Sequence, residues 1–322
     1  MAPIPGSVRG VLEHLADSDG IILRRDAIAL GYDDNYLARA RRAGDIARIR
    51  QGAYVLTPIW DQADRVGKHL LLVGAVVKLY DDRVAVSHQS ACVTQGGPNW
   101  GLDLSTAHLT NLYGIGERSA ARVTHHRGTC RVGDVSRNGA GWITSPARTA
   151  LDTATLAGRD AAVCVLDWYL NQGLVTEEEL RIGLETKTEW ADTLSLFTKV
   201  QLCDGRSESV GETRSRLLCS DRGLPRPELQ FKVFHPSGLI AGRTDFAWPE
   251  HRALGEFDGL HKYLRTRRPG ETIEQAVLRE KSREDLLREL TGWTFIRLVW
   301  ADLATPAPTA ARIRRALGRI AA

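Results

Sequence analysis

The chain has 322 residues, of which 43% are apolar and 25% charged, and a formal net charge of +4. This composition excludes an extensively disordered chain, and the length favours two or three domains over one core. No apolar run approaches the length of a membrane span, and no basic segment followed by an apolar core opens the sequence, so we expect no membrane partner and no secretory signal. The five cysteines are scattered without zinc-site spacing, which favours reduced thiols in the cytoplasm.

The positive charge is concentrated in the last third of the sequence. Residues 205–322 carry 21 Lys or Arg against 15 Asp or Glu, a net of +6, whereas the first 204 residues have a net of −2. A basic surface around acidic residues suits a phosphodiester substrate held near a metal ion. On charge alone, a solvated arginine-rich surface is an equal alternative.

Residues 7–57 show the pattern of a small helical unit. Apolar spacing predicts helices near 8–15, 24–30 and 34–43, with Asp33 or Asp34 as the cap of the third helix and Gly44 as its end. The following segment, IARIRQGAYVL, alternates like a small hairpin. Three helices and a hairpin form the order of a winged helix-turn-helix, with a third helix that could enter a major groove. Its candidate DNA contacts are arginines of the third helix (Arg39, Arg41 and Arg42) and of the wing (Arg48 and Arg50). The alternative is a protein-binding winged helix.

The segment GDIARIRQGAYVL resembles the end of the N-terminal domain of AbiEi-type antitoxins. That resemblance implies DNA binding by residues 1–57 and names a toxin, or another defence or repair protein, as a candidate partner. It does not imply that the chain is itself an antitoxin.

Residues 58–200 have mixed α/β signals and are expected to form a scaffold. Helices are predicted near 64–78, 161–172, 177–184 and 194–202, and strands over 104–110 and 120–128. Residues 84–96 suggest a strand or turn that leads into a helix, and residues 142–158 a strand, a turn at Ser145-Pro146 and a helix. The segments SHQSA, HHRG and TSPARTALD resemble the second domain found with AbiEi-type N-termini, where Arg127 and Arg148 could add contacts to a DNA backbone. His88, His108, His125 and His126 lack the spacing of a metal or nucleophile motif, so structural roles are expected for them.

Residues 201–322 contain the strongest chemical pattern. The predicted order is a helix near 208–219, three strands over 228–258, a helix near 271–290, a strand over 294–300 and a last helix. The strands include TDFAWPEHRALGEFDGLHK, in which Asp245, Glu256 and Asp258 lie in or beside apolar runs. Buried carboxylates need a partner, a proton or a cation, and Asp245 and Glu256 on neighbouring strands could share a hard divalent ion. An isolated structural role for each acid is the alternative, and Glu212 could simply pair with Arg216.

This segment, together with EKSREDLLRELTGWTFIRLVW, resembles the DUF559-type, very-short-patch-repair-like branch of the PD-(D/E)xK nucleases. The resemblance implies a restriction-endonuclease-like α/β domain that hydrolyses DNA with Mg²⁺ or Mn²⁺. Glu212, Asp245 and Glu256 would hold the metal, and Asp258 could complete the shell. The family pattern has a lysine where this chain has Asp258, which leaves Lys262, ranked first, and Lys281 to assist the water. Arg265, Arg267, Arg268 and Arg283 would hold the phosphates. The rival hypothesis is a DNA-binding regulator without enzymatic activity.

Overall fold

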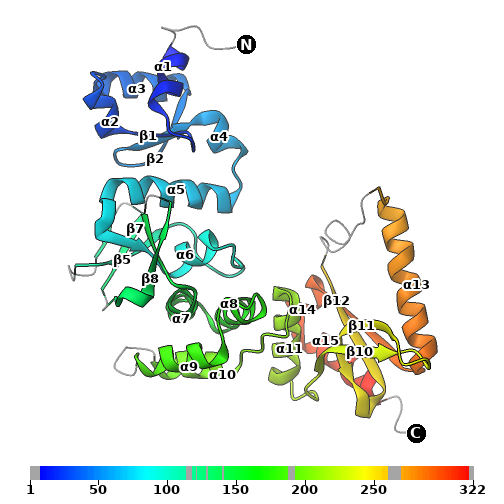
Figure 1. The fold of residues 1–322 in the computed structure, drawn as a ribbon. Coiled ribbons are helices and arrows are strands. Elements are labelled where there is room, and N and C mark those ends of the chain that lie inside the picture. The colour runs from blue at the N-terminus through cyan, green and yellow to red at the C-terminus, as the bar shows by residue number, and fades with distance from the viewer. Residues whose placement is uncertain are drawn as a thin grey trace. The chain divides into compact units, whose positions relative to one another are not determined.

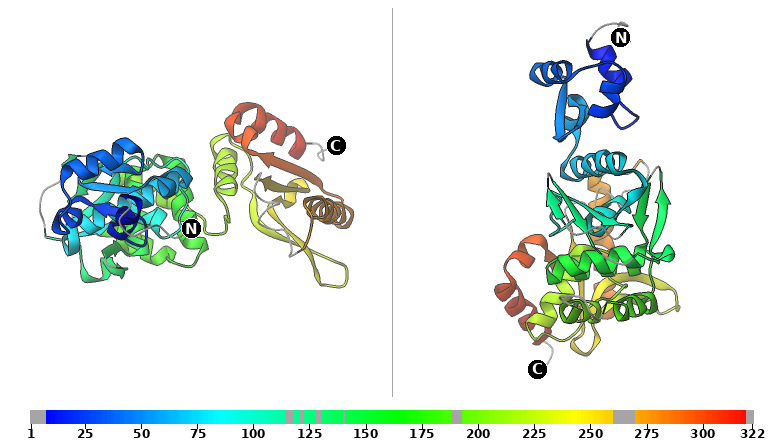
Figure 2. Two further views of the ribbon diagram at one scale, coloured as in Figure 1. Left: turned by 90° about the horizontal axis from the view of Figure 1, so that it is seen from above. Right: turned by 90° about the vertical axis from the view of Figure 1, so that its left-hand side faces the viewer.

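The computed structural model describes residues 8–113, 118–120, 122–127, 130–139, 141–187, 193–259 and 270–318. The chain divides into two compact units, one of residues 1–165 and 174–199, and one of residues 166–173 and 200–322. Figures 1 and 2 show the helices and strands of both units.

The first unit begins with a winged helix. Its elements are α1 (Val8–Leu15), β1 (Ile21–Leu23), α2 (Arg24–Ala29), α3 (Asp34–Ala43), β2 (Ile46–Arg50), β3 (Ala53–Leu56) and α4 (Thr57–Gln62). The strands form an antiparallel sheet in the order β1-β3-β2, so the predicted hairpin gains a strand that the sequence pattern did not indicate. The Asp33 side chain accepts a 2.7 Å hydrogen bond from Tyr36 N, and Gly44 ends α3 at a φ of +82°. Both predicted boundaries of the third helix are confirmed.

The rest of the first unit is built on a second sheet. Its strands, in the order β6-β7-β5-β4-β9-β8, are β4 (Val84–Val86), β5 (Ala107–Asn111), β6 (Arg118–Ala120), β7 (Val123–His126), β8 (Val135–Asn138) and β9 (Gly141–Thr144). Its helices are α5 (Arg65–Tyr80), α6 (His88–Thr94), α7 (Pro146–Leu156), α8 (Arg159–Asn171), α9 (Glu177–Glu185) and α10 (Thr193–Gln201). The second half of α8, from residue 166, and the last residues of α10 belong to the second unit. Figure 1 shows α5 next to the winged helix.

Helix α5 joins the two sheets of the first unit into one core. Leu72 and Val76 of α5 pack in a single apolar cluster with Ile49 and Val55 of the winged helix and with strand residues such as Leu109. The apolar core therefore does not stop at residue 57, where the sequence pattern predicts a domain boundary. Burial of these side chains fixes the winged helix on α5.

The second unit contains α11 (Val210–Asp221), β10 (Glu228–Phe234), β11 (Ile240–Trp248), β12 (Ala253–Asp258), α13 (Ile273–Thr291), β13 (Thr294–Val299), α14 (Trp300–Ala304) and α15 (Pro306–Gly318). The sheet order is β10-β11-β12-β13, in which the first three strands are antiparallel and β13 pairs parallel with β12. This is the order of elements that the sequence pattern predicts.

The sheet of the second unit is covered on both faces. Phe246, Trp248 and Phe257 pack with residues of α11, α14 and α15 on one face. Ala247, Leu254 and Leu287 belong to a separate cluster on the face that α13 covers. Figure 2 shows α13 apart from the other helices, across the sheet. Because side chains alternate between faces along a strand, Glu256 and Asp258 lie on the α13 side with Leu254, and ion pairs link both to α13.

A buried aspartate from α8 holds α11 in place within the second unit. Asp167 accepts hydrogen bonds from Asp204 N at 2.6 Å and Thr213 Oγ1 at 2.7 Å, and it pairs with Arg216 at 2.8 Å. Arg216 therefore does not pair with Glu212, which was the structural alternative. Burial raises the pKa of Asp167 in spite of the Arg216 charge.

Candidate functional site

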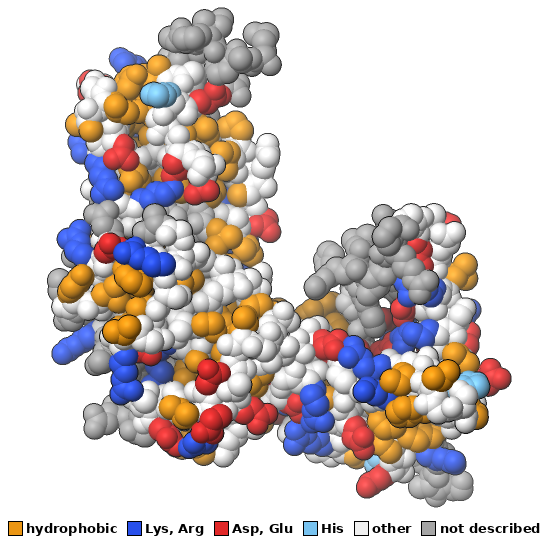
Figure 3. All heavy atoms as spheres, viewed as in Figure 1, with side chains coloured by type: hydrophobic (Ala, Val, Ile, Leu, Met, Phe, Trp, Pro, Cys, Tyr) orange, Lys and Arg blue, Asp and Glu red, His pale blue; other side chains and the backbone are white. Residues whose placement is uncertain are grey.

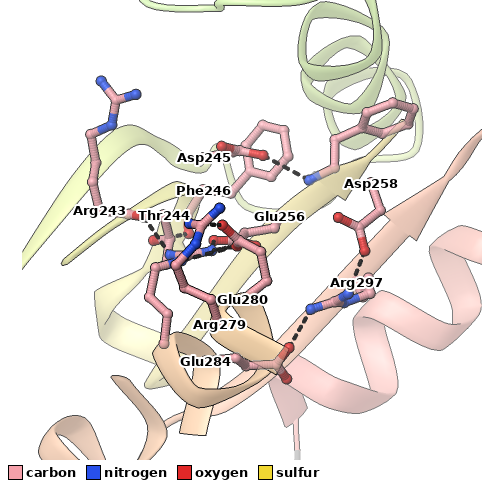
Figure 4. Close-up of polar contacts among 12 residues, drawn as sticks. Arg243, Thr244, Asp245, Phe246, Glu256, Asp258, Arg279, Glu280, Glu284 and Arg297 are labelled. Atoms are coloured by element: carbon pink, nitrogen blue, oxygen red, sulfur yellow. Dashed lines mark hydrogen bonds and ion pairs between the residues drawn. The ribbon is translucent and has the colours of Figure 1, made fainter. Parts of the chain in front are cut away.

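The predicted acidic site forms around the junction of α11, β11 and β12. Phe246 pairs with Gly255 across the two strands, which puts Asp245 opposite Glu256. Asp245 Oδ2 accepts a hydrogen bond of 2.8 Å from Phe257 N, as the close-up in Figure 4 shows. The backbone N–H of β12 thus orients Asp245 beside the neighbouring strand.

Glu212 is brought to this site by the first turn of α11. Its carboxylate accepts hydrogen bonds from Glu208 N at 2.9 Å, from Ser209 Oγ at 2.8 Å and from Gln230 Nε2 at 2.8 Å. Burial, and then the charge of Asp245, raises the pKa of Glu212 to about 7. Burial of Glu212 and the nearby charge of Asp245 therefore both favour the protonated form of Glu212.

Arg283 of α13 occupies the position beside Glu256. Its guanidinium forms an ion pair with Glu256, whose side chain is 2% exposed, and another with Glu280 at 2.9 Å. Its Nη1 also donates to the carbonyl of Arg243 at 3.0 Å. Burial alone would lower the pKa of Arg283, but the charges of Glu256 and Glu280 raise it above its ordinary value. Arg283 is thus a cation built into the acidic site.

Asp258, the third acid of the predicted site, has an arginine partner of its own. Arg297 of β13 lies between Asp258 and Glu284, and Figure 4 shows the guanidinium bridging the two carboxylates. Register places Glu256 opposite Arg297 and Asp258 opposite Val299 across β12 and β13. Asp258 is therefore part of an ion-pair chain under α13.

The two lysines predicted to assist a water have different outcomes. Lys262 lies outside the described residues, as do Arg265, Arg267 and Arg268. Lys281 is an exposed residue of α13. Arg283 and Leu287 occupy the side of this helix that faces the strands, so Lys281 has no direct contact there in the described structure, and its assisting role stays a prediction.

Carboxylates are suitable ligands for a hard cation, but in this structure the carboxylates of the site are already engaged by other groups. In the parts of the chain that the structure describes, no three His, Cys, Asp or Glu side chains are grouped as ligands for one ion. Glu256 and Asp258 face guanidinium groups, and Glu212 and Asp245 accept hydrogen bonds from their neighbours. As placed, the residues do not fit a divalent metal ion.

The arginines of the winged helix fall into two groups. Arg39, Arg41, Arg42 and Arg48 are exposed, and no ion pair within the described residues engages them. Figure 3 shows basic side chains on the visible face of the N-terminal unit. Arg50 is half-buried, with its guanidinium carbon 5.9 Å from the centre of the Tyr80 ring. The exposed group leaves a cationic face on α3.

Two expectations about the scaffold have different outcomes. Arg148, predicted to contact DNA, has a side chain only 10% exposed and pairs with Asp152 at 2.7 Å and Asp134 at 3.2 Å, so this prediction is wrong. The histidines lie in structural contacts, as expected. His126 Nε2 is 2.8 Å from His108 Nδ1, and its ring stacks on that of His88 at 3.7 Å.

Several residues of these sites were missed from sequence. Gln230, which supports Glu212, lies at an irregular point of β10 with a φ of +56°, for which no local pattern exists. Arg283 was assigned to phosphate rather than to Glu256. Its spacing of four residues from Leu287 was a usable signal, because residues four apart share one helix face.

Comparison with known proteins agrees with the winged helix. Residues 11–57 match the family model described as transcriptional regulator, AbiEi antitoxin.

Within the described residues, none of the helices has both the length and the apolar composition needed to cross a membrane.

Two Mycobacterium tuberculosis proteins are similar to most of the chain. They are "Uncharacterized protein MT2308" of strain CDC 1551 / Oshkosh and "Uncharacterized protein Rv2248" of strain ATCC 25618 / H37Rv. Each is 31% identical over 236 residues, which is 72% of this chain and 82% of the relative. The chain therefore belongs to the family of these two mycobacterial proteins, and it begins with an AbiEi antitoxin-like DNA-binding regulator domain.

Proposed function

We propose that this protein is a DNA-binding regulator that contacts DNA through α3. The observation that carries the proposal is the exposed set of Arg39, Arg41 and Arg42 on the third helix of a winged helix. In such modules this helix enters the major groove, and arginines supply both phosphate and base contacts. The match of residues 11–57 to an antitoxin transcriptional regulator supports the same reading.

The partner of such a regulator would be DNA near its own gene, and a toxin or another defence or repair protein would be the protein partner. This part of the proposal rests on the family description of the N-terminal segment alone.

Binding of the full chain to a duplex from upstream of its own gene, compared with a scrambled duplex of equal length, tests the proposal. Fluorescence anisotropy over a series of salt concentrations should show tighter binding to the upstream duplex and a steep salt dependence. A chain in which Arg39, Arg41 and Arg42 are all changed to Ala is the matched control. Equal binding of both duplexes by the wild type and by this variant would overturn the proposal.

A Mg²⁺- or Mn²⁺-dependent nuclease is the second candidate function. It is favoured by the order of elements in the second unit, by the closeness of Glu212 to Asp245, and by the position of Glu256 on the strand next to that of Asp245. In this candidate the three carboxylates would hold the ion, and Lys262 and the arginines at 265, 267 and 268 would assist at the phosphate. Because the Arg283 guanidinium is paired with the Glu256 carboxylate, the ion could bind Glu256 only after that guanidinium moved away.

Plasmid nicking by the full chain separates the two functions. Wild type and Asp245→Ala are compared with Mg²⁺ or Mn²⁺, each with and without chelator, on duplex, single-stranded and mismatched DNA. Metal-dependent nicking that Asp245→Ala abolishes would establish the nuclease. Absence of cleavage on all substrates would leave the second unit without a catalytic role.

A further inference from the structure

The wing of the winged helix contains an irregularity that the scaffold compensates. The pairing of β2 with β3 shifts between Arg48 and Arg50, so Ile49 lies at a bulge in the ladder. A bulged residue loses its regular partner in the neighbouring strand, and a buried carbonyl without a donor is costly. The Ile49 carbonyl accepts a 3.2 Å hydrogen bond from Arg122 Nη1.

Arg122 lies in the turn that joins β6 to β7, where its φ is +66°. Hairpin turns are where such left-handed conformations occur. The Nε of Arg122 donates to the Ser105 carbonyl at 3.1 Å, so one guanidinium joins the wing to the segment before β5.

A second contact holds the same hairpin on α5. The Arg50 guanidinium lies over Tyr80, whose ring packs edge-on against His125 with centroids 4.7 Å apart. Arg50 Nε and Nη1 are buried and have no hydrogen-bond partner in the described structure. The guanidinium therefore depends on the ring, and it is directed at the scaffold rather than at solvent.

The docked wing supports the helix proposed to contact DNA. Ile46 of β2 packs with Leu37 and Ala40 of α3 in one apolar cluster. Ile49, three residues along the same strand, belongs to the cluster built on α5. The orientation of α3 is thus linked through β2 to the scaffold.

We propose that Arg122 is a positioning residue for DNA binding, which holds the bulge of the wing on the scaffold and thereby fixes the orientation of α3. In this arrangement Ile49 and Arg50 of the wing face the scaffold and Arg50 is not a phosphate contact, whereas Arg48 of the same strand stays exposed. The effect on DNA rests on the proposed regulator function, but the docking of the wing does not.

Hydrogen exchange of the DNA-free full chain tests the docking. Arg122→Ala should speed exchange of the wing amides from Ile49 to Val55 about tenfold, which corresponds to the net worth of one charged hydrogen bond, ~1.4 kcal/mol. Arg122→Lys should restore part of the protection. Arg137→Ala is the matched control, because Arg137 is an exposed arginine of the same sheet that contacts Asp82 and Trp142.

Tyr80→Leu supplies an independent test if Arg122→Ala unfolds, because it removes the ring under Arg50 and keeps an apolar side chain. It should also loosen the wing selectively. Unchanged wing exchange in the folded variants, or a loss of protection spread evenly over the first unit, would overturn the proposal.

Anisotropy with the upstream duplex then tests the consequence for DNA. Arg122→Ala should weaken binding about five- to tenfold without changing the slope against salt, because no phosphate contact is lost. A reduced slope would identify Arg122 as a phosphate contact and contradict a positioning role. If the wild type binds no DNA, the regulator function fails, and hydrogen exchange alone still decides whether Arg122 holds the wing.

Discussion

Arginines play opposite parts in the two ends of this chain. On α3, Arg39, Arg41 and Arg42 are exposed and engaged by no ion pair in the described structure. Under α13, Arg283 and Arg297 are each held between two carboxylates. The excess of basic residues lies in the sequence of the second unit, yet the two arginines nearest its carboxylates are internal partners of those carboxylates. Net charge counted by segment therefore does not tell which individual arginines can contact DNA.

Among substitutions that test this difference between the arginines of α3 and those under α13, Arg283→Ala is expected to have the largest effect, and the effect is on stability. It leaves Glu256 buried without its cation, and we expect the free energy of unfolding of the second unit to fall by about 3 kcal/mol. Urea denaturation followed by hydrogen exchange in β12 measures this loss.

Arg288→Ala is the control for that change, because the Arg288 side chain is 48% exposed and its partner Glu284 keeps Arg297 as a second cation, so the loss should matter much less. Added Mg²⁺ that stabilised Arg283→Ala but not wild type would show that Glu256 accepts a metal once the guanidinium is gone. An equal effect of the two substitutions would contradict the role given to Arg283.

The next effect concerns Glu212, whose pKa is raised to about 7. A carboxyl group with a folded-state pKa above its unfolded value of about 4.5 contributes stability that is fully present below pH 4.5 and is lost as pH rises through 7. Glu212→Gln, which resembles the protonated form, should therefore exceed wild type in stability at pH 8 by roughly 1–3 kcal/mol and differ little at pH 5. Unfolding of both proteins over this pH range measures the difference. A constant difference across the range would contradict it.

The α3 arginines should act on the salt dependence of DNA binding. Each of Arg39→Ala, Arg41→Ala and Arg42→Ala is expected to lower the slope of log K against log salt by about 0.9 if that residue contacts a phosphate. Arg297→Ala serves as the comparison from the second unit and should leave the slope unchanged. A larger change in slope for Arg297→Ala than for the α3 variants would reverse the assignment of the DNA-binding face.

The smallest effect is expected from Lys281→Ala. Because this side chain is exposed on α13 and lies apart from the carboxylates, neither stability nor any nicking activity should change measurably. Thermal unfolding and the plasmid assay measure these two quantities. A loss of nicking in a folded variant would show that Lys281 takes part in the reaction.

Local patterns predicted most elements of the chain because each boundary has a local cause. Asp33 and Thr176 cap their helices, and Gly44 and Gly292 end theirs in left-handed conformations. The alternation around Asp245 and Glu256 likewise predicted their neighbouring positions.

What the sequence could not predict depends on contacts between distant segments. The bond from Arg122 to Ile49 joins residues 73 apart, and the pair of Asp167 with Arg216 joins residues 49 apart. The sequence offers each arginine many possible carboxylate and carbonyl partners, and the tertiary fold decides which of them lies next to it. The ion pair between Arg283 and Glu256 could not be predicted for the same reason.

The contribution of α8 to the second unit has a practical consequence for dissecting the protein. A fragment begun at residue 201 would lack Asp167, and it would leave Arg216, Thr213 and the Asp204 amide without their acceptor. We do not expect such a fragment to fold as the domain does in the full chain. A fragment or domain exchange that keeps these contacts has to include the end of α8, so the domain boundary lies before residue 166 rather than at residue 201.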